Sequence, residues 1–247
     1  MKKKILALAL VAILAVTAVA GASLAYLTDK DEAVNVMTLG NVNIEQNERD
    51  RFGSDFVQNQ PLFPMVDLRG KNDPFVENGL FHENVKNVID KFVTVTNTGD
   101  YAAYVRTIIA FETGIIYEPN SDVIHGYMHD IYIGMLDNGL VFLENEDKTP
   151  MIINWNGKQY ALAVLVYEEA LAPGYTTEPS LKQFFLAPTA NNEITTLFGE
   201  TYEILCLSQG VQAAGFESAG AAYALDAAFG AITEEAAEAW FAAVVQE

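Results

Sequence analysis

Three histidines are the first candidates for metal chemistry in this sequence: His82, His125 and His129. A zinc hydrolase of the His-Glu-x-x-His type needs two histidines on one helical face and a glutamate as base. A glutamate follows His82, but no histidine stands four residues after it. His125 and His129 have the required spacing, with Asp130 as a third ligand, but Gly126 stands where the glutamate should be. The pattern therefore favours a surface loop, with His125, His129 and Asp130 as weak metal candidates.

The single cysteine is the next candidate, for covalent chemistry. Cys206 lies in the apolar run Tyr202–Leu207, which favours a buried small side chain over a nucleophile. The sequence also contains no Gly-x-Ser-x-Gly elbow, phosphate-binding loop or dinucleotide fingerprint. We therefore assign no catalytic residue and expect no enzyme activity.

The carboxylates give no stronger site. Asp29 and Asp31 begin like a calcium loop, but Val34 stands at the sixth position, where that loop requires glycine. Two close carboxylate pairs have the residue type of a glycosidase site, but such pairs are expected on any surface this acidic. They are Glu144 with Glu146 and Glu168 with Glu169. No cofactor is expected, and neither calcium nor zinc finds support.

The start of the chain has the pattern of a secretory signal peptide. Three lysines at Lys2–Lys4 precede an apolar run over Ile5–Gly21, and Ser23-Leu24-Ala25 fits the small-x-small cleavage pattern. We expect cleavage between Ala25 and Tyr26, which makes residues 1–25 a signal peptide and the product extracellular. An uncleaved membrane anchor is the alternative, since the apolar run is only slightly shorter than the roughly 20 residues of a membrane span.

The charge of the chain limits the kinds of partner that it can bind. Cleavage removes three lysines and no acids, so the mature chain has 11 basic and 33 acidic side chains, a net charge of −22. Such a surface repels nucleic acid and anionic membranes. We therefore expect no nucleic-acid partner and contact with a membrane only during export.

The elements that would position any site are predominantly strands. Alternation predicts one bulged or two short strands over residues 34–44, with Val42 and Ile44 facing a core. Residues 92–96 and 103–111 flank the turn Asn97–Asp100 and predict a hairpin. Further strands are predicted over 131–135, 140–143, 151–155, 160–167, 180–186 and 202–207, with Asn156-Gly157 as a hairpin turn. This spacing is typical of a mainly β, antiparallel sandwich over residues 26–210.

Two segments depart from this pattern. Residues 46–87 form an irregular insertion punctuated by prolines and glycines, and we expect its scattered phenylalanines to pin it onto the sheet. The alanine-rich residues 211–247 predict a short helical appendage. Its first helix is closed by Gly230 and its second is capped by Thr233. We expect these helices to cover one edge of the sandwich.

The start of the mature chain resembles the TasA/camelysin family of Gram-positive bacteria. The resemblance rests on an aromatic-x-x-Asp-like segment followed by a Gly-Asn-Val-x-Ile strand, and weaker likenesses occur around residues 92–111, 181–183 and 211–216. The matching positions are Tyr26, Thr28, Asp29, Gly40, Asn41, Val42 and Ile44. Residues 46–87 match nothing in that family.

The resemblance implies a jelly-roll-like sandwich, processing by a signal peptidase of the SipW type, and a structural role in biofilm matrix fibres. It also implies self-association into filaments by donation of the freed N-terminal segment to a neighbouring subunit. The donor residues would be Tyr26, Leu27, Val34, Val36 and Met37. An extended peptide can pair with the open edge of a sheet, which makes donation physically reasonable.

Three alternatives stay open. The segment 26–37 could instead fold onto its own domain. A camelysin-like metallopeptidase would use His125 and His129. A monomeric adhesin would bind through the aromatic-rich residues 46–87.

Overall fold

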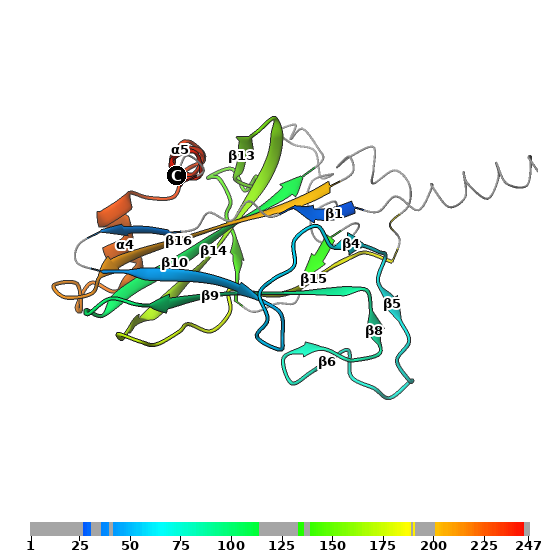
Figure 1. Cartoon of the computed structure of the whole chain (residues 1–247). Coiled ribbons are helices and arrows are strands. Elements are labelled where there is room, and N and C mark those ends of the chain that lie inside the picture. Colours follow the sequence, from blue (N-terminus) through cyan, green and yellow to red (C-terminus); the bar gives the residue numbers. More distant parts are fainter. Residues whose placement is uncertain are drawn as a thin grey trace, which may run out of the picture.

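The computed structural model describes residues 27–30, 36–39, 42–113, 133–135, 139–188, 190 and 201–244. Most of these residues lie in two facing β-sheets, and two helices cover the outer face of the larger sheet (Figure 1). The prediction of a mainly β, sandwich-like fold with a C-terminal helical segment is therefore confirmed. No helix within the described residues is long and apolar enough to cross a membrane.

The larger sheet has eight strands, in the order β12-β14-β10-β16-β1-β4, with β13 also paired to β14 and β2 also paired to β16. Its strands are β1 (Leu27–Lys30), β2 (Val36–Leu39), β4 (Pro61–Leu62), β10 (Ala103–Thr113), β12 (Val141–Phe142), β13 (Ile152–Trp155), β14 (Lys158–Leu171) and β16 (Thr201–Gln212). All of its pairs are antiparallel except those of β1 and β2 with β16, which are parallel.

The smaller sheet has four antiparallel strands in the order β11-β15-β9-β3. They are β3 (Ile44–Arg49), β9 (Val88–Asn97), β11 (Ile133–Met135) and β15 (Leu181–Leu186). Two small pairs complete the strands, β5 (Val66–Asp67) with β8 (Val85–Lys86) and β6 (Val76–Glu77) with β7 (Leu80–Phe81).

The predicted hairpin around Asn97–Asp100 is wrong, although both of its strands exist. β9 belongs to the smaller sheet and β10 to the larger one, so the turn carries the chain from one sheet to the other. Inner positions of β9 alternate with less buried ones, whereas β10 is buried along its whole length because helices cover its other face. The Asn97 side chain holds this connection by donating to the carbonyls of Tyr101 and Leu171, 2.8 Å each.

The hairpin predicted at Asn156-Gly157 is confirmed. β13 and β14 pair from Trp155 with Lys158 onward. Asn156 and Gly157 have φ values of 47° and 78°, the left-handed pair that a tight two-residue hairpin turn requires.

Two layers of apolar side chains hold the sheets and helices together. The first fills the space between the sheets, and it includes Val93, Ile109, Phe184 and Cys206, so the interpretation of the cysteine as a buried small side chain is confirmed. Val42 and Ile44 are buried as predicted, in a smaller cluster at one end. The second layer lies between the larger sheet and the helices.

The two helices are α4 (Ala221–Phe229) and α5 (Glu234–Val244). Gly230 ends the first with φ 89°, and the Thr233 hydroxyl caps the second by accepting from the amide of Ala236 at 3.1 Å. Trp240 and Phe241 pack with residues of β10, β14 and β16. The helices thus cover a face of the larger sheet rather than an edge of the sandwich, which corrects the expected position.

The insertion begins later than predicted, because residues 46–49 still belong to β3. Phe81 pins it as expected: its ring is buried and packs edge-on against Phe75 and against Phe185 of β15 (5.1 and 5.3 Å between ring centroids). Phe52 does not follow this expectation, since 85% of it is exposed.

Candidate functional site: the leader strands on β16

Residues 27–41 are here called the leader, and its two described strands, β1 and β2, pair with strand β16 of their own chain. β16 pairs with β10 on one side, and on the other side it pairs in parallel with β1 and then β2. In Figure 1 the two leader strands lie near opposite ends of β16. Of the two alternatives left open by the sequence, pairing within the chain is the arrangement of this structure.

The two leader strands continue one another along the same edge. Lys30 is paired with Glu203 and Val36 with Ser208, so six steps along the leader correspond to five along β16. Both described strands of the leader therefore pair in parallel with β16.

The outer side of the leader is covered only at its beginning. Leu27 and Thr28 pair with Leu62 and Pro61 of β4, a two-residue strand from the insertion. Leu62 itself is fully buried in the core between the sheets. No strand among the described residues pairs with the outer side of β2, which leaves that half of the leader at the edge of the sheet.

The side chains of β16 are fixed from both faces, so the edge that receives the leader is preformed. On the inner face, the Ser208 hydroxyl donates to Gln46 Oε1 of β3 at 2.7 Å and lies 3.1 Å from the Thr107 hydroxyl of β10. On the same face Gly210 packs against Ile44. These contacts do not involve the leader.

An ionic cluster supports β16 where β1 pairs with it. Lys158 Nζ lies 3.0 Å from Glu112 Oε2 and 3.3 Å from Glu203 Oε1, and the Tyr160 hydroxyl donates to Glu203. The Glu112 carboxylate also accepts the backbone N–H of Glu203 at 2.8 Å. The last residue pair between β10 and β16 is Phe111 with Ile204, so the backbone N–H of Glu203 lies just beyond the ladder. The Glu112 carboxylate gives this amide its hydrogen-bond acceptor.

Burial raises the pKa of Glu112 to about 7, against the opposing effect of the Lys158 ammonium. Two carboxylates, one with a pKa near neutrality, have the residue types of an acid–base pair. Here, however, both are buried and each is bound to Lys158, so the arrangement serves to hold three strands together.

Several residues singled out by the sequence lie outside the described residues: Ala25, Tyr26, Val34, His125, His129 and Asp130. Leu27, Val36 and Met37 are described as strand residues: Leu27 pairs with Leu62 of β4, and Val36 and Met37 pair with Ser208 and Gln209 of β16. His82 lies in the insertion, 3.7 Å from Glu77. Within the described part of the chain, no group of His, Cys, Asp and Glu side chains is arranged to hold a metal ion.

Sequence reasoning missed the role of β16 as the receiving strand and the cluster beside it. A signal for the cluster was present, because Glu112 ends an otherwise apolar strand and Glu203 begins another. No local signal identifies the partner of the leader. No family model, curated protein or solved structure matches this sequence.

Proposed function

We propose that this chain is an exported structural subunit that assembles by placing its leader on strand β16 of a neighbouring copy. This is the role that the resemblance to the TasA/camelysin family implies. The observation that supports it is the parallel pairing of β1 and β2 with an edge of β16 whose other contacts are made by the body of the chain.

Exchange of the leader between copies conserves its contacts. The same residue pairs form whether the leader comes from the same chain or from another, so the two states differ mainly in the entropy of association. High local concentration then favours exchange. The leader is 15 residues long from Leu27 to Asn41, and it can reach about 50 Å when extended.

Leader exchange can produce either a closed dimer or an open filament. Two chains that swap leaders reciprocally form a closed dimer. When exchange is not reciprocal, each added copy has a free edge or a free leader at the end of the assembly, and growth continues as a filament. A fibre subunit uses the second route.

Mixed single-cysteine chains test this directly. Thr28 of β1 is paired with Thr201 of β16, and neighbouring strands are about 5 Å apart, which suits a disulfide. One preparation carries Thr28→Cys and the other Thr201→Cys, both with Cys206→Ala. After mixing and mild oxidation, we expect a disulfide between the two preparations, because it requires a leader on the β16 of another chain.

A matched control pairs Thr28→Cys with Tyr223→Cys, since Tyr223 is exposed on α4, on the face of the sheet that the helices cover. Equal disulfide yields in the test and the control would refute leader exchange. Electron microscopy of the oxidised mixture then separates filaments from closed dimers. A chain that begins after Met37 should form no filaments, and polymerisation of that chain would also contradict the mechanism.

A further inference from the structure

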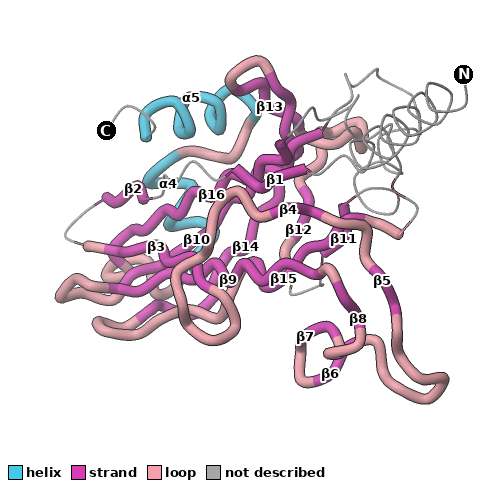
Figure 2. The backbone as a smooth tube through the Cα atoms, turned by 45° about the vertical axis from the view of Figure 1, so that its right-hand side comes forward, coloured by secondary structure: helices cyan, strands magenta, loops and turns pink. Residues whose placement is uncertain are grey.

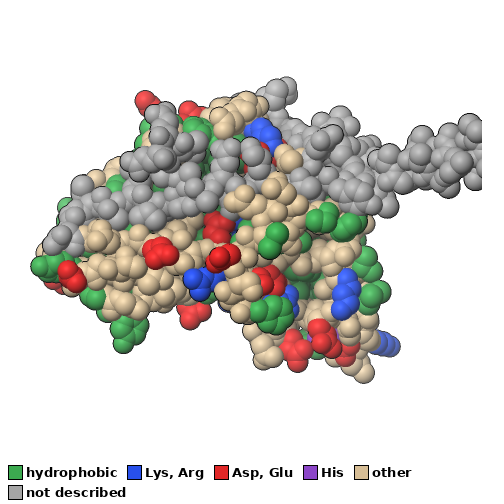
Figure 3. Space-filling model, in the orientation of Figure 1, with side chains coloured by type: hydrophobic (Ala, Val, Ile, Leu, Met, Phe, Trp, Pro, Cys, Tyr) green, Lys and Arg blue, Asp and Glu red, His purple; other side chains and the backbone are tan. Residues whose placement is uncertain are grey.

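Exposed apolar side chains concentrate on the insertion. Eleven large apolar side chains are exposed among the described residues, and seven of them lie between residues 52 and 76. They include Leu68 and Phe75, which are 61% and 38% exposed. Figure 3 shows apolar side chains at the end of the molecule that carries the insertion. Apolar side chains grouped in this way on a surface indicate an interaction site.

The part of the insertion that projects furthest, residues 68–75, is held in one conformation by its own contacts (Figures 1 and 2). We call it the tip. Asp73 donates its amide to the Gly70 carbonyl at 3.0 Å and accepts the Gly70 amide on its carboxylate at 2.9 Å. The Arg69 guanidinium pairs with Asp67, donates to the Asp73 carbonyl and stacks 4.6 Å over the Phe75 ring. Lys71 is thus presented on a braced turn, which lowers the entropy lost on binding.

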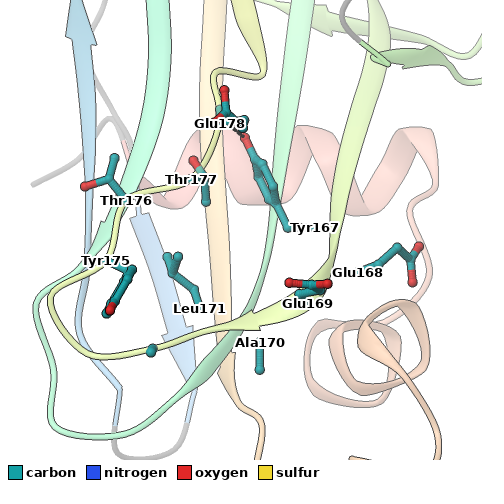
Figure 4. Close-up of a pocket in the computed structure, with 10 residues that line it drawn as sticks. Tyr167, Glu168, Glu169, Ala170, Leu171, Tyr175, Thr176, Thr177 and Glu178 are labelled. Atoms are coloured by element: carbon teal, nitrogen blue, oxygen red, sulfur yellow. Dashed lines mark hydrogen bonds between the residues drawn. The ribbon is translucent and has the colours of Figure 1, made fainter.

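A pocket of about 410 Å³ lies between the end of β14 and the loop that follows it (Figure 4). It exists because β14 bulges: Tyr167 and Leu171 pair with Val105 and Ala103 of β10, so three residues of β14 face one of β10. Tyr175 stands on the loop side with 68% of its surface exposed.

The pocket is acidic as well as aromatic. Its ten lining residues include Glu168, Glu169 and Glu178, and none is a lysine or arginine. Tyr167 and Tyr175 contribute two aromatic rings. Carboxylates beside aromatic rings suit a cationic side chain with an apolar neighbour, because the ring faces and the carboxylates both attract the cation.

The tip and the pocket lie at opposite ends of the molecule (Figures 1 and 2). The insertion joins β9 at Val88, while the loop of the pocket pairs with the other end of the strand through Thr96 and Thr176. The ten residues of β9 span about 30 Å. The tip of a chain therefore does not reach the pocket of the same chain.

We propose that the tip of one copy docks into the pocket of the next. The tip presents the exposed Lys71 ammonium, while Arg69 is engaged with Asp67 and the Phe75 ring, in a chain that is otherwise strongly acidic. The pocket is the complementary surface, with Glu169 and the exposed Tyr175 among its lining residues, while the Glu168 side chain points away from the loop (Figure 4). Because the two surfaces differ and lie at opposite ends, the contact is heterologous and can repeat along a filament. It rests on the proposed function of a self-associating subunit, and an exchanged leader would strengthen so small a contact by raising its effective concentration.

Cysteines next to the charged residues test the contact without removing those charges. Asn72 adjoins Lys71 and Ala170 adjoins Glu169, and both are exposed. Full-length mature chains carrying Asn72→Cys and Ala170→Cys, each with Cys206→Ala, are mixed and oxidised mildly. We expect disulfide-linked dimers several-fold above the yield of a control pair, Asn72→Cys with Tyr223→Cys.

Charge reversal supplies the second measurement. Lys71→Glu in the first chain should lower the disulfide yield to the control level, and Glu169→Lys in the second should restore it. The proposal is overturned by a disulfide yield that never exceeds that of the control pair. It is also overturned by a disulfide yield that changes with neither charge reversal. Binding of added polylysine to the pocket, in a mixture that forms no Asn72–Ala170 disulfide, would also overturn the proposal. The pocket would then bind a cationic partner other than a second copy of this chain.

The Thr28–Thr201 disulfide separates this proposal from leader exchange. If that disulfide forms and the Asn72–Ala170 disulfide does not, only the docking contact is refuted. If only the Asn72–Ala170 disulfide forms, docking is supported and leader exchange is refuted.

Discussion

Gly210 of β16 lies directly against Ile44 of β3, so that a Cβ placed on Gly210 would come within 3.0 Å of the Ile44 Cδ1. Gly210 is also the residue of β16 that pairs with Thr38 of the leader. A close contact between the two sheets therefore lies at the position where the leader pairs with β16. Ile44 begins β3, the strand that follows the leader in the chain, so the same contact fixes where the leader departs from the body of the protein.

A larger residue at this point should separate the sheets. We expect Gly210→Val to lower the free energy of unfolding by about 1–3 kcal/mol, because overpacking a core forces side chains and backbone to shift. Urea denaturation followed by circular dichroism measures the change. Combining it with Ile44→Ala should recover part of the loss, since the two residues touch. Strictly additive effects of the two substitutions would contradict a steric contact.

The strands were predictable from sequence, but their assignment to sheets was not. Alternation in β9 and the mostly apolar residues of β10 locate both strands, whereas the hairpin prediction assumed that neighbours in sequence pair with each other. Whether a turn joins two strands of one sheet or crosses between sheets depends on what covers their faces. For β10 that cover is helices more than 100 residues away in the chain.

The candidate site was predictable only in part, for a similar reason. The leader was located from the predicted signal-peptide boundary and from its alternating residues. Its parallel partner β16 begins at Thr201, so the pairing depends on contacts between the two ends of the chain. The tip and the pocket depend likewise on the bulge in β14 and on side-chain contacts of Arg69 that residue spacing does not reveal.

The pKa of Glu112 predicts a dependence of stability on pH. The folded chain holds the proton more tightly than the unfolded chain, since burial raises the pKa from 4.5 to about 7. This contribution to stability is therefore complete below about pH 4.5 and is lost as the pH rises through about 7. Relative to Glu112→Gln, the wild type should lose up to about 3 kcal/mol over this range.

Urea unfolding of both proteins at a series of pH values measures this difference. Lys158→Met should steepen the dependence, because the Lys158 ammonium opposes the rise in the pKa of Glu112. Parallel pH profiles for the wild type and Glu112→Gln would exclude a raised pKa at this position.

Arg106 should be the residue that holds α4 on the sheet. It is 2% exposed, and its guanidinium donates to Gln209 at 2.7 Å, Asp226 at 2.7 Å and the Gly230 carbonyl at 3.1 Å. We expect Arg106→Leu to cost about 2–4 kcal/mol of unfolding free energy, because the three hydrogen bonds of a buried guanidinium are lost, although the Asp226 side chain is half exposed.

Arg106→Lys should restore little of this loss, since an ammonium does not reproduce the planar fork of a guanidinium. Lys148→Ala is a matched control, because Lys148 pairs with Glu144 in an exposed position and should contribute less than about 1 kcal/mol. Equal losses for Arg106→Leu and Lys148→Ala in urea denaturation would show that Arg106 does not hold the helix.

Assembly of so acidic a subunit should accelerate when its charge is screened. The chain has 14 basic and 33 acidic side chains, and the proposed cleavage would remove three of the basic ones, so copies should repel one another at low ionic strength. Raising the salt concentration from about 10 mM to about 0.15 M shortens the screening length from about 30 Å to about 8 Å. Light scattering should then rise faster, and it should also rise faster at acid pH, where carboxylates lose their charge. Because added salt at constant pH leaves the protonation of Glu112 essentially unchanged, acceleration by salt alone assigns the effect to screening. Scattering that responds to neither salt nor pH would mean that repulsion between copies does not limit assembly.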